Sequence, residues 1–172
     1  LDKNWQRRGL THLAEREHLG VLTGSPVTDM RITLVAGRAH IKHTEGGDFR
    51  QATYRAVRHG LMRAKSVLLE PYFEFRMELP VESIGRAMTD VERMCGKCKP
   101  PENCGEEMVL FGSAPVASLQ GYAAEFMAYT RGRGHISCRV IGYLPCHNTQ
   151  EVMDRIAYRP EADLENSADS VF

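Results

Sequence analysis

Two stretches of this chain, each with a strand-like pattern followed by a helix-like pattern, constrain its fold more than any other feature. Residues 72–79 alternate between apolar and polar side chains, which is typical of a strand with one buried face. Apolar residues then recur every three or four positions in residues 84–94, which predicts a helix with one apolar side. The apolar face of the first strand consists of Phe73, Phe75, Met77 and Leu79.

The same order returns further along the chain. Residues 108–113 are strand-like, residues 115–129 have helical spacing, and residues 136–140 alternate again. If the Cys-rich residues 98–104 add a short strand that pairs with 108–113, the order becomes β-α-β-β-α-β. That order is the split βαβ, or ferredoxin-like, arrangement, in which helices cover one face of an antiparallel sheet.

The first third of the chain has a different pattern. Residues 2–19 suggest a helix, and residues 27–35 alternate, which predicts a strand with Met30, Ile32 and Leu34 facing inward. After a loop, a helix is expected from Asp48, a good N-cap, to Ala64. One strand is too little sheet to be stable alone, so we expect a piece of a longer protein.

These patterns predict an α+β protein with two small α/β sandwich domains. The first domain would span residues 1–66 and be incomplete at its N-terminus, and the second, ferredoxin-like domain would span 67–150. Residues 151–172 would form a C-terminal extension with one short helix, and the acidic residues from Pro160 onward are expected to fray.

Charge is distributed unevenly although the net charge is zero. Residues 1–66 contain 12 Lys or Arg against 6 Asp or Glu, and residues 67–172 contain 10 against 16. The basic first part is therefore the better candidate for contact with phosphate groups. The candidate residues for contact with a polyanion, in both parts of the chain, are His40, Lys42, His43, Arg50, Arg55, Arg58, Arg131 and Arg133.

Each of these groups also has an ordinary structural interpretation. Residues 48–64 could form an amphipathic helix whose charged side simply faces water. Arg131 and Arg133 lie in the sequence TRGRG after a predicted helix, where cations favour the negative end of the helix dipole. Glycines beside arginines also allow close approach to phosphates, for which the guanidinium is well shaped.

Three cysteines form the best candidate metal site. Cys95 and Cys98 have the two-residue spacing with which thiolates share a zinc ion, and Cys104 could join them. Cys146 or His147 would have to supply the fourth ligand. The alternative is a surface hairpin with reduced thiols, because five cysteines in a chain without a secretion signal are typical of a cytoplasmic protein.

Several common sites are absent from the sequence. It contains no phosphate-binding G-x-x-x-x-G-K-[ST] or G-x-G-x-x-G motif, no H-E-x-x-H zinc motif and no G-x-S-x-G nucleophile motif. It also has no run of about 18 apolar residues, so no membrane partner is expected.

Five segments together resemble the C-terminal part of elongation factor G and of the tetracycline-resistance ribosomal protection proteins. They are PVTDMRITL at 26–34, GRAH at 37–40, LLEP at 68–71, the helix that leads to Cys95-Gly96, and residues 122–134, which end in TRGRG. The resemblance implies that residues 1–66 are most of domain IV and residues 67–150 are domain V.

The resemblance also implies a function. His40 would occupy the tip loop that enters the decoding site, flanked by Lys42 and His43, while Arg131 and Arg133 would face ribosomal RNA. The partners would be the ribosome, the RNA of both its subunits and the GTPase domain of the same protein. GTP and magnesium would bind that domain, which is absent here, so no cofactor and no catalytic residue are expected in this chain.

Two other functions stay open at this point. The first is a zinc- or thiol-dependent enzyme that uses Cys95, Cys98 and Cys104. The second is a stand-alone ferredoxin-like regulatory domain that binds a small metabolite. The sequence also leaves open whether the parent protein moves tRNA or ejects tetracycline.

Overall fold

The computed structural model describes residues 3–38 and 46–169, which belong to two compact units. Unit 1 comprises Leu1–Ser66 together with Thr149–Phe172, and unit 2 comprises Val67–Asn148. Residues 149–169 therefore pack with the N-terminal helices, although they follow unit 2 in the sequence.

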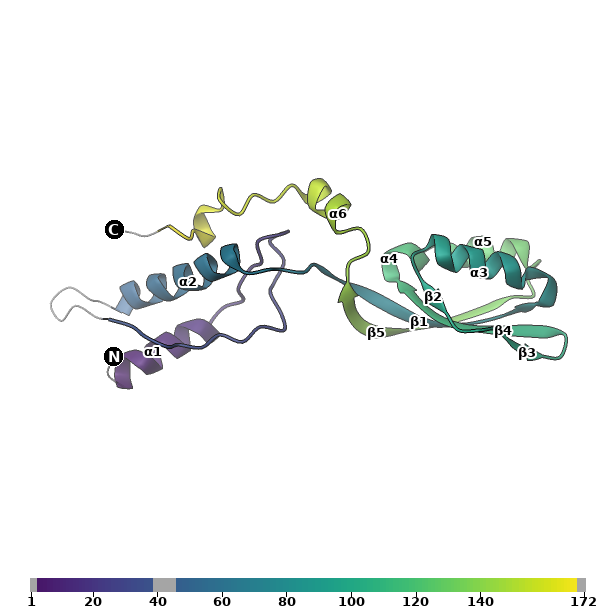
Figure 1. The fold of residues 1–172 in the computed structure, drawn as a ribbon, viewed down its shortest axis with the longest axis horizontal. Coiled ribbons are helices and arrows are strands. Elements are labelled where there is room, and N and C mark those ends of the chain that lie inside the picture. The colour runs from purple at the N-terminus through teal and green to yellow at the C-terminus, as the bar shows by residue number, and fades with distance from the viewer. Residues whose placement is uncertain (1–2, 39–45, 170–172) are drawn as a thin grey trace. The chain divides into compact units, whose positions relative to one another are not determined.

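Unit 2 is an antiparallel sheet with helices on one face (Figure 1). The strands run in the order β2-β4-β1-β5, and β3 also pairs with β4. In chain order its elements are β1 (Leu69–Pro80), a 3-10 turn (Val81–Ser83), α3 (Ile84–Arg93), β2 (Lys97–Cys98), β3 (Glu102–Cys104), β4 (Glu107–Pro115), α4 (Val116–Leu119), α5 (Tyr122–Tyr129) and β5 (His135–Pro145).

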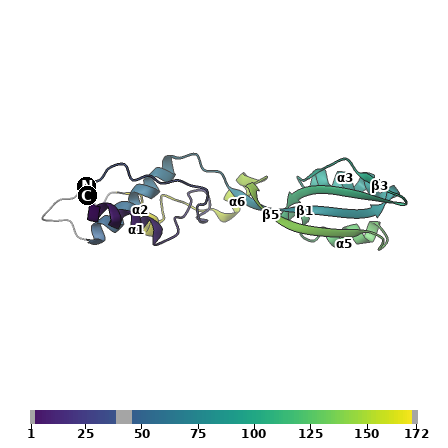
Figure 2. The ribbon, with the colours of Figure 1, turned by 90° about the horizontal axis from the view of Figure 1, so that it is seen from below.

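This topology confirms the predicted α+β class and the ferredoxin-like unit. The Cys-rich segment supplies the expected short strand, split into β2 and β3, and both pieces pair with β4. Strand β1 lies between β4 and β5, where Met77 is opposite Leu110 on one side and Ile136 on the other. Seen from below, β1 and β5 lie side by side in front of α3 and α5 (Figure 2).

The core of unit 2 lies between the sheet and these helices. Phe75, Met77 and Leu79 are the inward side chains of β1, as their alternation predicts, and each is no more than 1% exposed. Since burying such side chains is the main favourable contribution to folding, this core fixes the position of everything built on it. The other buried members are Ala87, Val91, Met94, Leu110, Ala114, Leu119, Tyr122 and Phe126.

The second helix of unit 2 differs from the prediction because it is broken. The sequence indicates one helix over residues 115–129, whereas the structure has α4 and α5 separated by Gln120 and Gly121. Gly121 has a φ of 90°, a left-handed conformation that strongly favours glycine and interrupts the helix.

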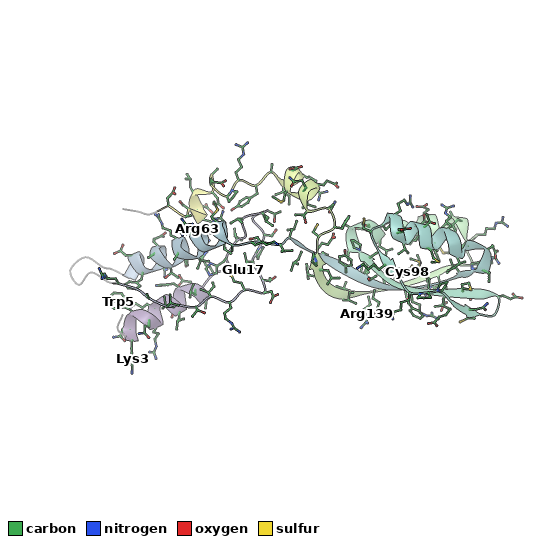
Figure 3. The ribbon with its side chains drawn as sticks, viewed as in Figure 1. Lys3, Trp5, Glu17, Arg63, Cys98 and Arg139 are labelled. Carbon is green, nitrogen blue, oxygen red and sulfur yellow. The ribbon has the colours of Figure 1, made fainter. Side chains whose placement is uncertain are left out.

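Unit 1 contains α1 (Lys3–Ala14), α2 (Gly46–Arg63), α6 (Thr149–Ile156) and a 3-10 turn at Leu164–Asn166. The two N-terminal helices pack together where the rings of Trp5 and Phe49 stack, with centroids 4.2 Å apart. Figure 3 labels Trp5 and shows these helices with their side chains.

The predicted strand at residues 27–35 is wrong. Residues 27–38 contain no strand, and the expected inward residues Met30, Ile32 and Leu34 are 38–41% exposed. A strand needs a neighbour for its backbone hydrogen bonds, and the described part of unit 1 offers none at this position. Leu34 instead lies against α1: its Cδ2 atom is 3.5 Å from the position that a Cβ atom at Gly9 would occupy.

Two further boundaries in unit 1 differ from the predictions. Helix α1 ends at Ala14 rather than near Leu19, because the chain turns back and the backbone N–H of Val27 donates to the carbonyl of His18 at 2.8 Å. Residues after Pro160 do not all fray: Asp163 accepts hydrogen bonds from Tyr158 at 2.6 Å and from the backbone of Asn166.

Candidate nucleic-acid interface

The sequence TRGRG at residues 130–134 forms a tight turn after α5. Thr130 is 1% exposed, and its hydroxyl donates to the carbonyl of Phe126 at 2.7 Å while accepting the backbone N–H of Gly134 at 3.1 Å. A side chain at Gly134 would collide with the ring of Phe126, only 2.3 Å from its Cβ position. The threonine and this glycine are therefore structural, and both arginines between them are exposed.

These arginines border a recess of about 320 Å³ on unit 2. Its lining includes one aromatic residue, Tyr129, and one carboxylate, Glu82. An aromatic ring and several guanidinium groups in one recess suit a phosphate or a stacked base. The residues that line the recess are Glu82, Ser83, Arg86, Tyr129, Arg131 and Arg133.

Two of the three cations in the recess already have carboxylate partners. Arg86 lies over the ring of Tyr129, 4.3 Å from its centroid, and bonds to Glu125 at 2.9 Å. Arg133 pairs with Glu82, whose pKa is lowered by a hydrogen bond from its own backbone and by this guanidinium. The side chains of Arg133 and Glu82 are 57% and 67% exposed, so this ion pair lies in water and is weak.

Two arginines of the predicted basic face of α2 have acceptors within unit 1. Arg50 binds the carboxylate of Glu15 at 2.9 Å, and Arg55 donates to the backbone carbonyl of Asp169. Glu15 also accepts a hydrogen bond from Tyr54, which is the main reason that its pKa is lowered. The RNA-binding role of Arg50 and Arg55 stays a prediction.

Arg58 requires a correction, because its predicted exposure on this face is wrong. Its side chain is 3% exposed and donates to the carbonyl of Leu19 at 3.0 Å, to the hydroxyl of Tyr158 at 2.7 Å and to the carbonyl of Pro160 at 3.2 Å. Leu19 precedes α2 in the sequence, whereas Tyr158 and Pro160 lie far beyond it, so segments from both ends of the chain meet at this side chain. Arg58 is therefore a buried structural residue in this unit.

Three predicted site residues, His40, Lys42 and His43, lie outside the described residues. The helix that follows their loop is present, and α2 begins at Gly46 rather than at Asp48. Their proposed role in the tip loop stays a prediction.

The predicted zinc cluster is not assembled. All five cysteines are reduced. Cys95, Cys98 and Cys104 do not form a group of converging donor atoms. Cys98 lies opposite Gly112 of β4 and Cys104 lies opposite Glu107, so the register places them at different points along that strand. The group of three potential metal ligands within residues 3–38 and 46–169 is instead Glu70, Cys146 and His147.

Sequence reasoning missed Arg86 as part of the recess. It lies in the first turn of α3, where it resembles any solvated helix charge. The signal that could have found it is topological: in a ferredoxin-like unit both helices cover one face of the sheet, so the start of α3 lies near the end of α5.

Two known family models match most of the chain. Residues 8–65 match the family model of elongation factor G domain IV, and residues 67–153 match that of the elongation factor G C-terminus. The chain belongs to the elongation factor G family. This membership confirms the resemblance seen in the sequence and favours a part of a translation factor over a metal enzyme or a metabolite-binding regulator.

Individual relatives agree with this assignment. The chain is 34% identical over 124 residues to elongation factor G 2 of Streptomyces coelicolor, covering 72% of this chain and 18% of that protein. It is 33% identical over 122 residues to the tetracycline resistance protein TetP of Clostridium perfringens, covering 71% of this chain and 19% of that protein. The chain thus spans less than a fifth of the length of these relatives.

A solved structure supports the fold. A protein from Thermus thermophilus superposes with a TM-score of 0.71 at 22% identity, over 91% of this chain and 24% of that one. Among the described residues of this elongation factor G family member, no helix is both long and apolar enough to cross a membrane.

Proposed function

We propose that this chain is a non-catalytic, ribosome-binding part of a translation factor whose remaining domains bind GTP and magnesium. The observation that carries the proposal is the recess on unit 2, where Arg131 and Arg133 project from a turn held by Thr130. Family membership supplies the partner, and the recess supplies a chemistry that fits the phosphates of ribosomal RNA.

Unit 1 would contribute the second contact. By the family resemblance, His40, Lys42 and His43 would reach the decoding site of the small subunit, while unit 2 binds RNA of the large subunit. Because Arg50, Arg55 and Arg58 have partners within unit 1, the loop before α2 is a better candidate for the RNA contact than the arginines of the helix.

Direct binding to purified ribosomes tests the proposal. The double variant Arg131→Ala/Arg133→Ala should bind about tenfold more weakly than the wild-type chain in about 100 mM salt, and its salt dependence should be shallower by about one unit for each phosphate that the variant no longer binds. The matched control is Arg139→Ala, which removes an exposed arginine from the sheet face away from the helices (Figure 3). Equally weakened binding by both variants would contradict the proposal.

The tip loop has its own test in the full-length protein. His40→Ala should impair translocation or drug release more than it impairs GTP hydrolysis, since the imidazole would act far from the nucleotide. Equal loss of both activities would argue against a role at the tip.

A further inference from the structure

Three side chains with potential metal-ligand atoms lie close together where the two ends of unit 2 meet. They lie outside the recess, and family membership assigns them no role. Glu70 lies near the start of β1, and Cys146 and His147 follow the end of β5. One donor atom from each of these three residues lies within 4.8 Å of the others. We propose that they form a binding site for a zinc ion, distinct from the predicted site at Cys95, Cys98 and Cys104.

The backbone sets the geometry of this site. Strand β5 pairs with β1 up to Pro145, which is opposite Leu69, and the backbone N–H of Cys146 then donates to the carbonyl of Leu68 at 2.8 Å. The chain turns here, so His147 lies over the carboxylate of Glu70. The ladder between two strands of the core therefore holds the three residues together before any ion binds.

The hydrogen bonds of Glu70 and His147 fix their side chains further. One carboxylate oxygen of Glu70 accepts the backbone N–H of His147 at 2.8 Å and lies 2.6 Å from its Nδ1. The side chains of His147 and Glu70 are only 21% and 12% exposed, so the site is partly shielded from water but still open to an ion. Pre-formed ligands reduce the ordering cost of binding.

The donor set indicates which metal would bind. One thiolate, one imidazole and one carboxylate match the mixed sulfur, nitrogen and oxygen ligands of zinc, with bonds of about 2.0–2.3 Å and water in the fourth position. Magnesium and calcium prefer oxygen ligands alone. On binding, the Cys146 thiol would release its proton to solvent, and the sulfur would bond to the ion as a thiolate.

The position of the site suggests its consequence. An ion held by these residues would cross-link the two ends of unit 2, since Glu70 and His147 are 77 positions apart in the sequence. Because the ion would bind only the folded unit, zinc should stabilise unit 2 against unfolding. This inference does not depend on binding to the ribosome.

Metal titration of the purified, reduced and chelator-treated chain tests the site. The chain should bind one equivalent of Zn²⁺ with a dissociation constant below about 1 µM, and Co²⁺ should give a thiolate charge-transfer band in the near ultraviolet. Cys146→Ser should remove that band. His147→Gln and Glu70→Gln should weaken zinc binding at least about tenfold, as losses around zinc sites commonly do.

Two controls separate this site from its alternatives. Cys138→Ser changes a thiol on β5 outside the cluster and should leave affinity unchanged, as should the triple variant Cys95→Ser/Cys98→Ser/Cys104→Ser. Zinc should also raise the melting temperature of wild-type unit 2 by several degrees but not that of Cys146→Ser. Absence of stoichiometric binding, or binding that survives Cys146→Ser and disappears in the triple variant, would overturn the proposal.

Discussion

Arg58 and Tyr158 are one hundred residues apart in the sequence and are joined by a 2.7 Å hydrogen bond from the guanidinium to the phenol oxygen. The phenol in turn donates to the carboxylate of Asp163 at 2.6 Å. The buried cation of α2 is thus linked through a tyrosine to an anion of the C-terminal segment. These hydrogen bonds connect the N-terminal part of unit 1 to its C-terminal part, although all of unit 2 lies between the two parts in the sequence.

Removing the guanidinium should destabilise unit 1. We expect Arg58→Ala to lower the free energy of unfolding by about 3 kcal/mol, because three acceptors lose their donor inside the unit. Trp5 is the only tryptophan of the chain and stacks on Phe49 of α2, so its fluorescence during urea denaturation reports on this unit alone.

The control for this variant lies further along the same helix. Arg63 is exposed, and Arg63→Ala should change the stability by no more than about 0.5 kcal/mol. If the two variants had the same urea midpoint, the buried network would contribute nothing to stability.

Asp163 should make unit 1 sensitive to acid. Hydrogen bonds from Tyr158 and then Asn166 hold its pKa below the ordinary value of 3.8. A carboxylate with a depressed pKa in the folded state stabilises the protein above its ordinary pKa, and this contribution is lost as the pH falls through the folded-state value. At neutral pH we therefore expect Asp163→Asn to have a lower urea midpoint than the wild type.

The pH dependence of that difference is the decisive measurement. The difference between the midpoints of the two proteins, followed by Trp5 fluorescence at pH 7, 5 and 3, should narrow toward the lowest pH. Glu15 has a lowered pKa in the same unit, so acid will weaken both proteins, and the comparison isolates the part due to Asp163. A difference that stayed constant across this range would contradict the assignment.

The sequence predicted unit 2 well because its patterns have their partners within the chain. The alternation around Phe75 and Met77 meets helices with matching apolar sides, and these elements form one core. Residues 27–35 alternate just as clearly, yet they form no strand, since no strand of the described residues lies beside them. A pattern shows which side chains could be buried together, but the backbone also needs a neighbour.

The candidate site was only partly predictable for a related reason. Arg131 and Arg133 could be identified from their own segment, because the glycines beside them indicate a tight turn. Arg58 looks like any charge on the polar side of a helix, and its burial depends on Tyr158, far away in the sequence. The cluster of Glu70, Cys146 and His147 likewise depends on the register of β5 against β1.

Gly112 should be essential for the sheet of unit 2. It lies between Phe75 of β1 and Cys98 of β2, and a Cβ there would be 2.3 Å from the Lys97 carbonyl oxygen and 2.4 Å from the Phe75 ring. Because backbone cannot yield cheaply, we expect Gly112→Ala to cost at least about 2 kcal/mol of unfolding free energy. Thermal unfolding by circular dichroism and hydrogen exchange of the β4 amides would measure the loss.

For a second glycine of the same unit, substitution by alanine should increase the free energy of unfolding instead of lowering it. Gly85 is an exposed residue of α3, and apart from its chain neighbours and the adjacent helix backbone no heavy atom lies within 4 Å of its Cβ position. Gly85→Ala should therefore stabilise the unit by about 0.5–1 kcal/mol through helix propensity. Destabilisation by both alanines would show that steric collision is not what distinguishes the two positions.

The ion pair between Glu82 and Arg133 should compete with RNA for the guanidinium. If the recess binds phosphate, Glu82→Gln removes both a competing acceptor and a negative charge from its lining, so affinity for ribosomes should rise about two- to fivefold. The ion pair is exposed and contributes little stability, so folding should be unaffected. In an Arg133→Ala background the gain from Glu82→Gln should shrink, because the cation that the carboxylate occupies is no longer present. Binding measured for the four proteins of this cycle decides the matter: weaker or unchanged binding by Glu82→Gln alone would place the RNA contact elsewhere on the unit.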